Sequence, residues 1–182
     1  MSKYIITKDI GGIKGLSLIE QNFDNNNKSF FSTYDKRDFY REELKMHFVQ
    51  DNEVYSKKGV LRGMHVNLKH PQGKLIRAIN GKIFDVVVDL RKESNTYKKC
   101  FGIELSGVNK KQIFIPEGMG HGYYVLEQAI VSCKVTTHYT SNDELGFAWN
   151  SQDLEIEWPI DSIPILLSEA DQDNKDLIYL EL

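Results

Sequence analysis

An arginine and a histidine stand three residues apart in the segment Val60-Leu61-Arg62-Gly63-Met64-His65, which otherwise has the apolar pattern of a strand. A guanidinium binds phosphate groups and an imidazole accepts protons, so the pair combines anion binding with general-base chemistry. Strict strand alternation would place the two side chains on opposite faces. We expect a bulge at Gly63 to bring both to one side. Taken alone, the segment favours a surface arginine and a structural histidine.

Two further segments offer a cation or an imidazole beside a strand. Lys74 opens the run 74–78, where alternation with Ile76 can turn the ammonium inward; a lysine at the rim is the simpler alternative. His121 lies between Gly120 and Gly122, which allow a ligand to approach the backbone closely. A histidine exposed to water in a tight turn explains this second pattern equally well.

A carboxylate near the C-terminus is a candidate partner for a histidine base. Asp171 follows Ser168 in an acidic segment. A carboxylate behind an imidazole fixes its tautomer and raises its basicity. The spacing does not show that Asp171 meets His65, and capping of a short helix by Ser168 or Asp171 is the alternative.

The elements that must position these side chains are mostly short apolar runs, rich in β-branched and aromatic residues. Turn signals separate them, such as Asn80-Gly81, Gly107-Val108-Asn109 and Pro116-Glu117-Gly118. We expect strands over residues 4–6, 15–19, 60–66, 74–78, 83–90, 101–105, 112–115, 122–126 and 130–139. A helix near 35–44, capped by Asp35, and a short one from Ser168 are also expected. Many short strands indicate an all-β barrel or sandwich.

Length, charge and cysteine content narrow the class of protein. The 182 residues suffice for one buried core, and we expect a single domain over residues 1–182. A net charge of -3 argues against a nucleic-acid partner. Cys100 and Cys133 lack metal-type spacing and are too few for a disulfide framework, which predicts a reducing compartment and no structural zinc. Without an apolar run of ~20 residues or a secretory signal, the chain is expected to be cytoplasmic, with no membrane partner.

In their order along the chain, these segments resemble the dTDP-4-dehydrorhamnose 3,5-epimerase family, which acts on nucleotide-linked 4-keto-6-deoxy sugars. The similarity runs from about Phe23 to Asp171. It rests on Phe48-Val49-Gln50-Asp51-Asn52, Val60-Leu61-Arg62-Gly63-Met64-His65, Gln72-Gly73-Lys74-Leu75, Phe84-Asp85-Val86-Val87-Val88-Asp89-Leu90-Arg91, Leu105-Ser106, Ile115-Pro116-Glu117-Gly118, Gly120-His121-Gly122 and Leu167-Ser168 with Asp171.

The resemblance implies a cupin-like jelly-roll barrel with a few short helices. It also implies a homodimer that shares strands between subunits, a nucleotide-sugar substrate, and chemistry without a cofactor or metal. A metal-binding cupin would be expected to show a His-x-His motif with a nearby Glu, which His65, His70 and His121 do not form. Family membership further implies deoxysugar supply for a bacterial capsule or lipopolysaccharide.

The resemblance also assigns roles to the candidate residues. A hydrogen next to a ketone is acidic because the resulting carbanion is delocalised as an enolate. His65 is then the base, supported by Asp171, and Lys74 meets the developing oxyanion. Binding of the substrate's diphosphate or hydroxyl groups falls to Arg62, His121, Gln50, Asn52 and His138.

The chain departs from the family's pattern at the proton donor. The family has a tyrosine before a Lys-x-Thr run, and here Cys133 precedes Lys134-Val135-Thr136. A buried apolar cysteine is the favoured interpretation; the thiol itself, or Tyr139, is the alternative donor. Without the tyrosine, we expect inversion of carbon 3 alone, or of carbons 3 and 5 through a substitute donor.

The nucleotide region departs as well, because Asn27-Lys28 stands in place of Arg-Gly and Asn52-Glu53-Val54 in place of Asn-His-Ser. The nucleotide can therefore be GDP or dTDP, and the sugar can be a hexose or a heptose. The alternative functions are a 3,4-ketoisomerase of related architecture and a catalytically inactive barrel that binds nucleotide sugars. The presence of His65, Lys74 and Asp171 together argues against the inactive barrel.

Overall fold

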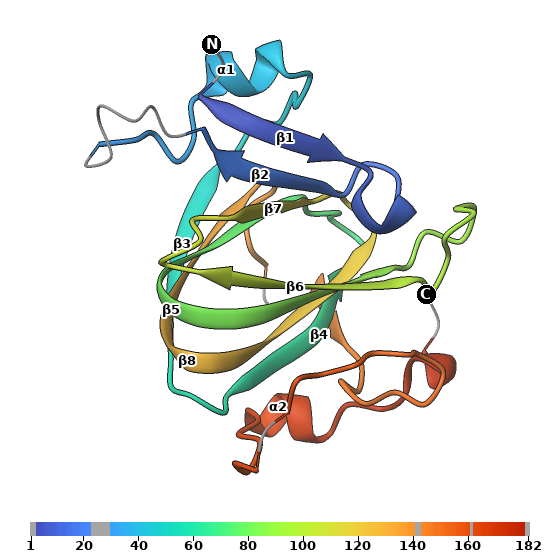
Figure 1. Cartoon of the computed structure of the whole chain (residues 1–182). Coiled ribbons are helices and arrows are strands. Elements are labelled where there is room, and N and C mark those ends of the chain that lie inside the picture. The colour runs from blue at the N-terminus through green and yellow to red at the C-terminus, as the bar shows by residue number, and fades with distance from the viewer. Residues whose placement is uncertain (1–2, 23–29, 141–142, 161, 181–182) are drawn as a thin grey trace.

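Among the described residues, nine strands form one sheet that curls into a barrel (Figure 1). The computed structural model describes residues 3–22, 30–140, 143–160 and 162–180. The polar segment 24–28, with Asn27 and Lys28, lies outside them. The strands are β1 (Tyr4–Lys8), β2 (Ser17–Gln21), β3 (Gln50–Ser56), β4 (Leu61–Asn67), β5 (Lys74–Asp89), β6 (Cys100–Ser106), β7 (Gln112–Ile115), β8 (Met119–Val135) and β9 (Glu144–Gly146). The helices are α1 (Lys36–Arg41) and α2 (Glu169–Gln172), with 3-10 turns at Ile10–Gly12 and Leu177–Tyr179.

Two long strands, β5 and β8, run through both layers of the barrel. The first half of β5 pairs with β7 and its second half with β6. The first half of β8 pairs with β4 and its second half with β3. One layer therefore has the order β1-β2-β7-β5-β8-β3 and the other β6-β5-β8-β4-β9. Apolar side chains fill part of the space between them, including Ile13, Leu16, Ile76, Ile83, Val87, Ile113, Val125 and Val131.

The prediction of a turn at Asn80-Gly81 is wrong, because β5 continues through these two residues. The register between β5 and β8 shifts around these residues, and Asn80 Oδ1 accepts a hydrogen bond from Ile130 N at 2.8 Å. Gly81 has a φ of 66°, and a Cβ there would overlap the carbonyl oxygen of Gln128. The glycine thus bends one strand from layer to layer. The strands expected at 122–126 and 130–139 likewise form one strand, β8, which ends at Val135, four residues before the expected end.

The two expected helices are present, although the first is shorter than expected. The Asp35 side chain accepts a hydrogen bond from Arg37 N at 3.0 Å and caps α1. Phe39 of α1 is fully buried against Tyr4 and other residues of the β1–β2 end. The helix ends before Glu43, whose φ of 63° is incompatible with helical backbone. Near the C-terminus, the short α2 lies below β4 in Figure 1.

Candidate active site

A cavity of about 310 Å³ lies between the two layers of the barrel. Its lining combines apolar side chains with two cations and two imidazoles, a composition that suits an anionic ligand. The lining residues are Asn52 and Val54 from β3, Arg62 and His65 from β4, Lys74 and Ile76 from β5, His121, Gly122, Tyr123, Val131, Cys133 and Val135 from β8, and Gln72, Tyr139 and Glu144 at the edge.

The bulge expected at Gly63 is confirmed. The pairing of β4 with β8 shifts register between Arg62 and His65, and both side chains line the same cavity. Gly63 has a φ of 103°, and a Cβ would lie 2.7 Å from His121 O. Only glycine therefore permits the close approach of β4 and β8 that turns the guanidinium and the imidazole to one side.

His65 and Asp171 meet across 106 residues of sequence. His65 Nε2 lies 2.7 Å from Asp171 Oδ1, and Ser168 Oγ donates to Asp171 Oδ2 at 2.8 Å. Burial acts to raise the pKa of Asp171, but the hydrogen bond from His65, the charge that this imidazole carries when it is protonated, and the hydrogen bond from Ser168 lower it on balance. An ionised Asp171 holds a proton on Nε2, which leaves Nδ1 as the nitrogen that can act as a base. Ser168 also caps α2, so the capping role and the pairing role coexist.

Removal of the Asp171 charge should slow proton transfer by His65 without unfolding the protein. Asp171→Asn keeps the side-chain shape and a hydrogen-bond acceptor for Nε2, but it cannot stabilise the imidazolium. We expect kcat to fall about 10–100-fold. Initial rates measured beside the exposed control Asp173→Asn check this, and equal kcat in wild type and Asp171→Asn would refute the role of Asp171.

A second histidine–aspartate pair lies beside the first. His121 Nε2 is 2.8 Å from Asp85 Oδ2, and Asp85 is fully buried. The exposed-turn interpretation of His121 is wrong, because this residue is buried within β8, where its Cα partner is His65 on β4. Asp85 thereby fixes the orientation of an imidazole next to His65.

Lys74 and Cys133 lie in the layer opposite His65. Lys74 is 8% exposed and lines the cavity with Ile76, so its expected inward orientation is confirmed. Cys133 lines the cavity too. Burial raises the pKa of its thiol to about 11, although the nearby charge of Lys74 acts in the opposite direction. The thiol is therefore neutral and keeps its proton at neutral pH.

Three other predicted residues differ in their placement. Asn52 lines the cavity, and Gln50 donates through Nε2 to Asn52 Oδ1 at 2.7 Å. Gln50 Oε1 accepts from Tyr139 N at 3.1 Å, so Gln50 connects Asn52 to the edge of the cavity, where Tyr139 lies. His138 is exposed beyond the end of β8, outside the set of described residues that line the cavity.

Tyr123 and Glu144 are cavity residues that the sequence reasoning missed. The Tyr123 hydroxyl lies 3.4 Å from Ser56 Oγ, which also accepts from Arg62 Nε at 3.2 Å; burial raises the pKa of this phenol. Glu144 Oε1 is 3.3 Å from His65 Nδ1. Strand alternation from His121 offered a signal for Tyr123, whereas β9 has three residues and offered none for Glu144.

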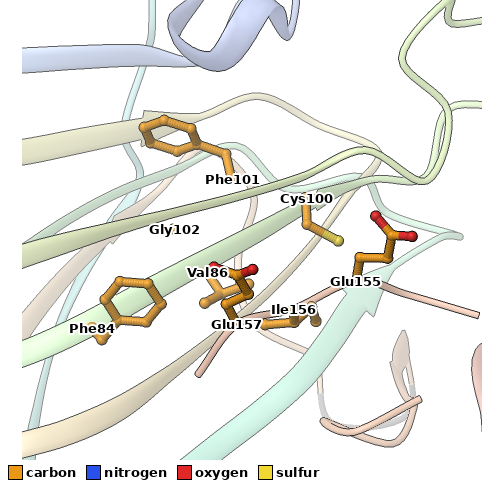
Figure 2. A pocket seen from close by; sticks show the side chains of 8 residues that line it. All are labelled: Phe84, Val86, Cys100, Phe101, Gly102, Glu155, Ile156 and Glu157. Carbon is orange, nitrogen blue, oxygen red and sulfur yellow. The ribbon is translucent and has the colours of Figure 1, made fainter. Parts of the chain in front are cut away.

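A second hollow, of about 240 Å³, lies outside the barrel between β6 and the segment 155–157 (Figure 2). It is lined by Phe84, Val86, Cys100, Phe101, Gly102, Glu155, Ile156 and Glu157. Burial raises the pKa of the Cys100 thiol to about 11, so the charged groups here are the two glutamates. Among the described residues that line it, this hollow has two carboxylates and no cation, whereas the barrel cavity combines Arg62 and Lys74 with a single glutamate. An anionic diphosphate is repelled by the first and attracted by the second, so the barrel cavity is the candidate active site.

Within the described ranges, no group of three or more His, Cys, Asp or Glu side chains is arranged to hold a metal ion. No helix among the same residues is long and apolar enough to cross a membrane.

A cupin-like jelly-roll barrel whose cavity holds a histidine–aspartate pair and a buried lysine suits the chemistry of a carbohydrate epimerase, a class of isomerase. The family model described as dTDP-4-dehydrorhamnose 3,5-epimerase matches residues 11–178. The chain belongs to this family.

Relatives and solved structures agree with this assignment. The chain is 40% identical over 168 residues to the dTDP-4-dehydrorhamnose 3,5-epimerase of Methanothermobacter thermautotrophicus, covering 91% of each chain. The crystal structure of the same enzyme from Elizabethkingia anophelis superposes with a TM-score of 0.87 at 36% identity, covering 97% of each chain. A dTDP-6-deoxy-D-glucose-3,5-epimerase from Legionella pneumophila, in complex with dTDP-4-keto-L-rhamnose, has a TM-score of 0.85 at 35% identity, covering 98% of this chain and 95% of that one.

Proposed function

We propose that this epimerase inverts carbon 3 of a nucleotide-linked 4-keto-6-deoxy sugar through an enolate. One observation carries the proposal: the paired base His65–Asp171 shares a cationic cavity with the buried Lys74 on the opposite layer. A base and a preorganised positive charge are the two groups that enolate formation requires.

The proposed reaction is a pair of proton transfers. His65 Nδ1 removes the proton from carbon 3, and the electron pair of that bond moves onto the ketone oxygen beside Lys74. Asp171 stabilises the imidazolium that forms. Return of a proton to the opposite face of carbon 3 regenerates the ketone with inverted configuration. Arg62 binds the diphosphate, and His121, oriented by Asp85, binds sugar oxygens.

Water supplies the returning proton in this proposal, at the place where the family has its tyrosine. Cys133 is shorter than a tyrosine and leaves room in a cavity that also has polar walls. Its thiol, with a pKa of about 11, is no stronger an acid than a phenol.

Cys133→Ser should therefore leave carbon 3 inversion within about threefold of wild type, because a required proton donor contributes about 10²–10⁴-fold. The rate of product formation measures this directly. A loss of 100-fold or more would show that the thiol is the donor and would overturn the proposal of water.

Inversion of both carbons 3 and 5 is the second candidate function. It is favoured by the phenols of Tyr123 and Tyr139, which line the same cavity and can donate protons at a second centre. The relatives described above carry the 3,5-epimerase name, which supports this candidate.

The proposal is tested by incubating dTDP- and GDP-linked 4-keto-6-deoxyhexoses and heptoses with the enzyme in D₂O and following each carbon by NMR. Deuterium and inversion at carbon 3 alone support the first candidate, and the same result at both carbons supports the second. A product whose ketone has moved to carbon 3 would show a 3,4-ketoisomerase. Absence of any uptake would favour the inactive binding barrel.

The sugar bound in the Legionella structure makes dTDP-linked sugars the first substrates to test. The homodimer and the cytoplasmic location stay predictions. For the homodimer, the exposed apolar residues Ile5 and Tyr55 lie on the edge strands β1 and β3, which are available for contact with a second copy.

A further inference from the structure

Both ring nitrogens of His65 face a carboxylate, and the two carboxylates differ in their surroundings. Asp171 lies 2.7 Å from Nε2, is 5% exposed and is held by Ser168. Glu144 lies 3.3 Å from Nδ1, and 23% of its side chain is exposed. One carboxylate is therefore buried and fixed, while the other contacts both the base and water.

Glu144 lies beside Nδ1, the nitrogen of His65 that must accept the proton. Because Asp171 holds the proton of Nε2, Nδ1 is left to accept the proton from carbon 3. Glu144 reaches Nδ1 from β9, which pairs with β4, and its Cα partner Asn67 lies two residues beyond His65. The strand pairing thus places this carboxylate beside the working nitrogen.

A carboxylate in a cavity for a diphosphate needs an explanation, because it weakens anion binding. The pKa of the Tyr139 phenol at the same edge is raised, mainly by the negative charge of Glu144 and to a smaller extent by burial. Substrate binding alone gives no reason for such a group, whereas turnover does: a base that has taken a proton must lose it before the next cycle.

We infer that Glu144 acts through His65 as a proton relay, taking the abstracted proton from Nδ1 and releasing it to water. The N–H bond of the imidazolium breaks, its electron pair stays on Nδ1, and the proton binds a Glu144 oxygen before passing to solvent. No electrons are exchanged with another molecule. The inference rests on the proposed function of His65 as the base.

The relay is tested by the label in substrate recovered after partial turnover in D₂O. When His65 returns its proton to the original face, the recovered substrate carries deuterium at carbon 3 only if that proton has first exchanged with solvent. We expect deuterium in the recovered substrate with wild type and about tenfold less with Glu144→Gln, at equal extents of conversion. The inverted product should stay fully deuterated in both, because its proton comes from the opposite face.

Two variants sharpen this result. Glu127→Gln serves as the matched control, because Glu127 is an exposed glutamate on β8 paired with Lys82 at 3.6 Å; we expect wild-type labelling. Glu144→Asp retains a carboxylate and should restore part of the exchange. Equal labelling of recovered substrate in wild type and Glu144→Gln would overturn the relay, as would unlabelled recovered substrate in wild type.

A substrate-free measurement separates the relay from the proposed function. At one fixed pH, the ¹⁵N NMR signals of His65 report which ring nitrogen carries a proton. At a pH where part of the His65 population is the imidazolium, we expect Glu144→Gln to lower the fraction that carries a proton on Nδ1, because the variant lacks the carboxylate that faces this nitrogen, while Nε2 keeps its proton. Unchanged Nδ1 would overturn the relay even in an active enzyme. A changed Nδ1 in a protein that labels no substrate would support the Glu144 contact and count against the proposed reaction.

Discussion

His65→Ala is expected to slow deuterium uptake at carbon 3 by about 10²–10⁴-fold. The substitution removes the imidazole that accepts the proton, and Asp171 behind it is too deeply buried to take its place. The His65 side chain is 27% exposed at the cavity, so the barrel should still fold. The measurement is the initial rate of exchange in D₂O, with the far-ultraviolet spectrum as a check of folding.

His47→Ala is the matched control, because His47 is exposed and lies outside the candidate site. Its exchange rate should equal that of wild type. If His65→Ala still exchanged carbon 3 at the wild-type rate, another group would be the base, and the assignment of the His65–Asp171 pair would fail.

Lys74→Met should lower kcat by about 10²–10³-fold with little change in KM. The ammonium stabilises negative charge that is present on the ketone oxygen only after the proton has left, so its loss raises the barrier more than it weakens substrate binding. Methionine nearly matches the length of the lysine stem and removes a buried charge, so it should not destabilise the protein.

Lys82→Met provides the control on the same strand, because Lys82 is partly exposed and paired with Glu104 and Glu127. It should keep wild-type kcat and KM. A Lys74→Met enzyme with a raised KM and an unchanged kcat would show that Lys74 binds the diphosphate instead of stabilising the enolate.

The sequence allowed prediction of the features that a single residue determines, namely the helix caps and the β-bulge. Asp35 and Ser168 cap helices as expected, and Gly63 forms the bulge that turns Arg62 and His65 together. Each of these outcomes depends on one residue and its immediate neighbours, and such short-range preferences can be read from a sequence.

Other elements could not be predicted because contacts distant in sequence decide them. Asn80-Gly81 has the chemistry of a hairpin turn, yet pairing with β8 on both sides keeps β5 continuous. β3 is an edge strand that begins with four consecutive polar residues, and β9 has only three residues, so neither has a strong apolar signal.

The candidate site shows the same division. Residue types identified His65, Lys74, His121 and Asp171 as candidates, but the resemblance to a family was needed to join them. The partners that the fold supplies, Asp85 for His121 and Glu144 for His65, come from strand pairing that no spacing in the sequence reveals.

The central claim is that carbon 3 is inverted through an enolate, and one measurement tests it most directly. The enzyme is allowed a single turnover in D₂O with unlabelled substrate, and the deuterium content at carbon 3 of the inverted product is determined by NMR. The account predicts one deuteron at carbon 3 in essentially every inverted molecule, because the new hydrogen comes from solvent on the face opposite His65. An inverted product that retains its original hydrogen at carbon 3 would contradict the enolate mechanism.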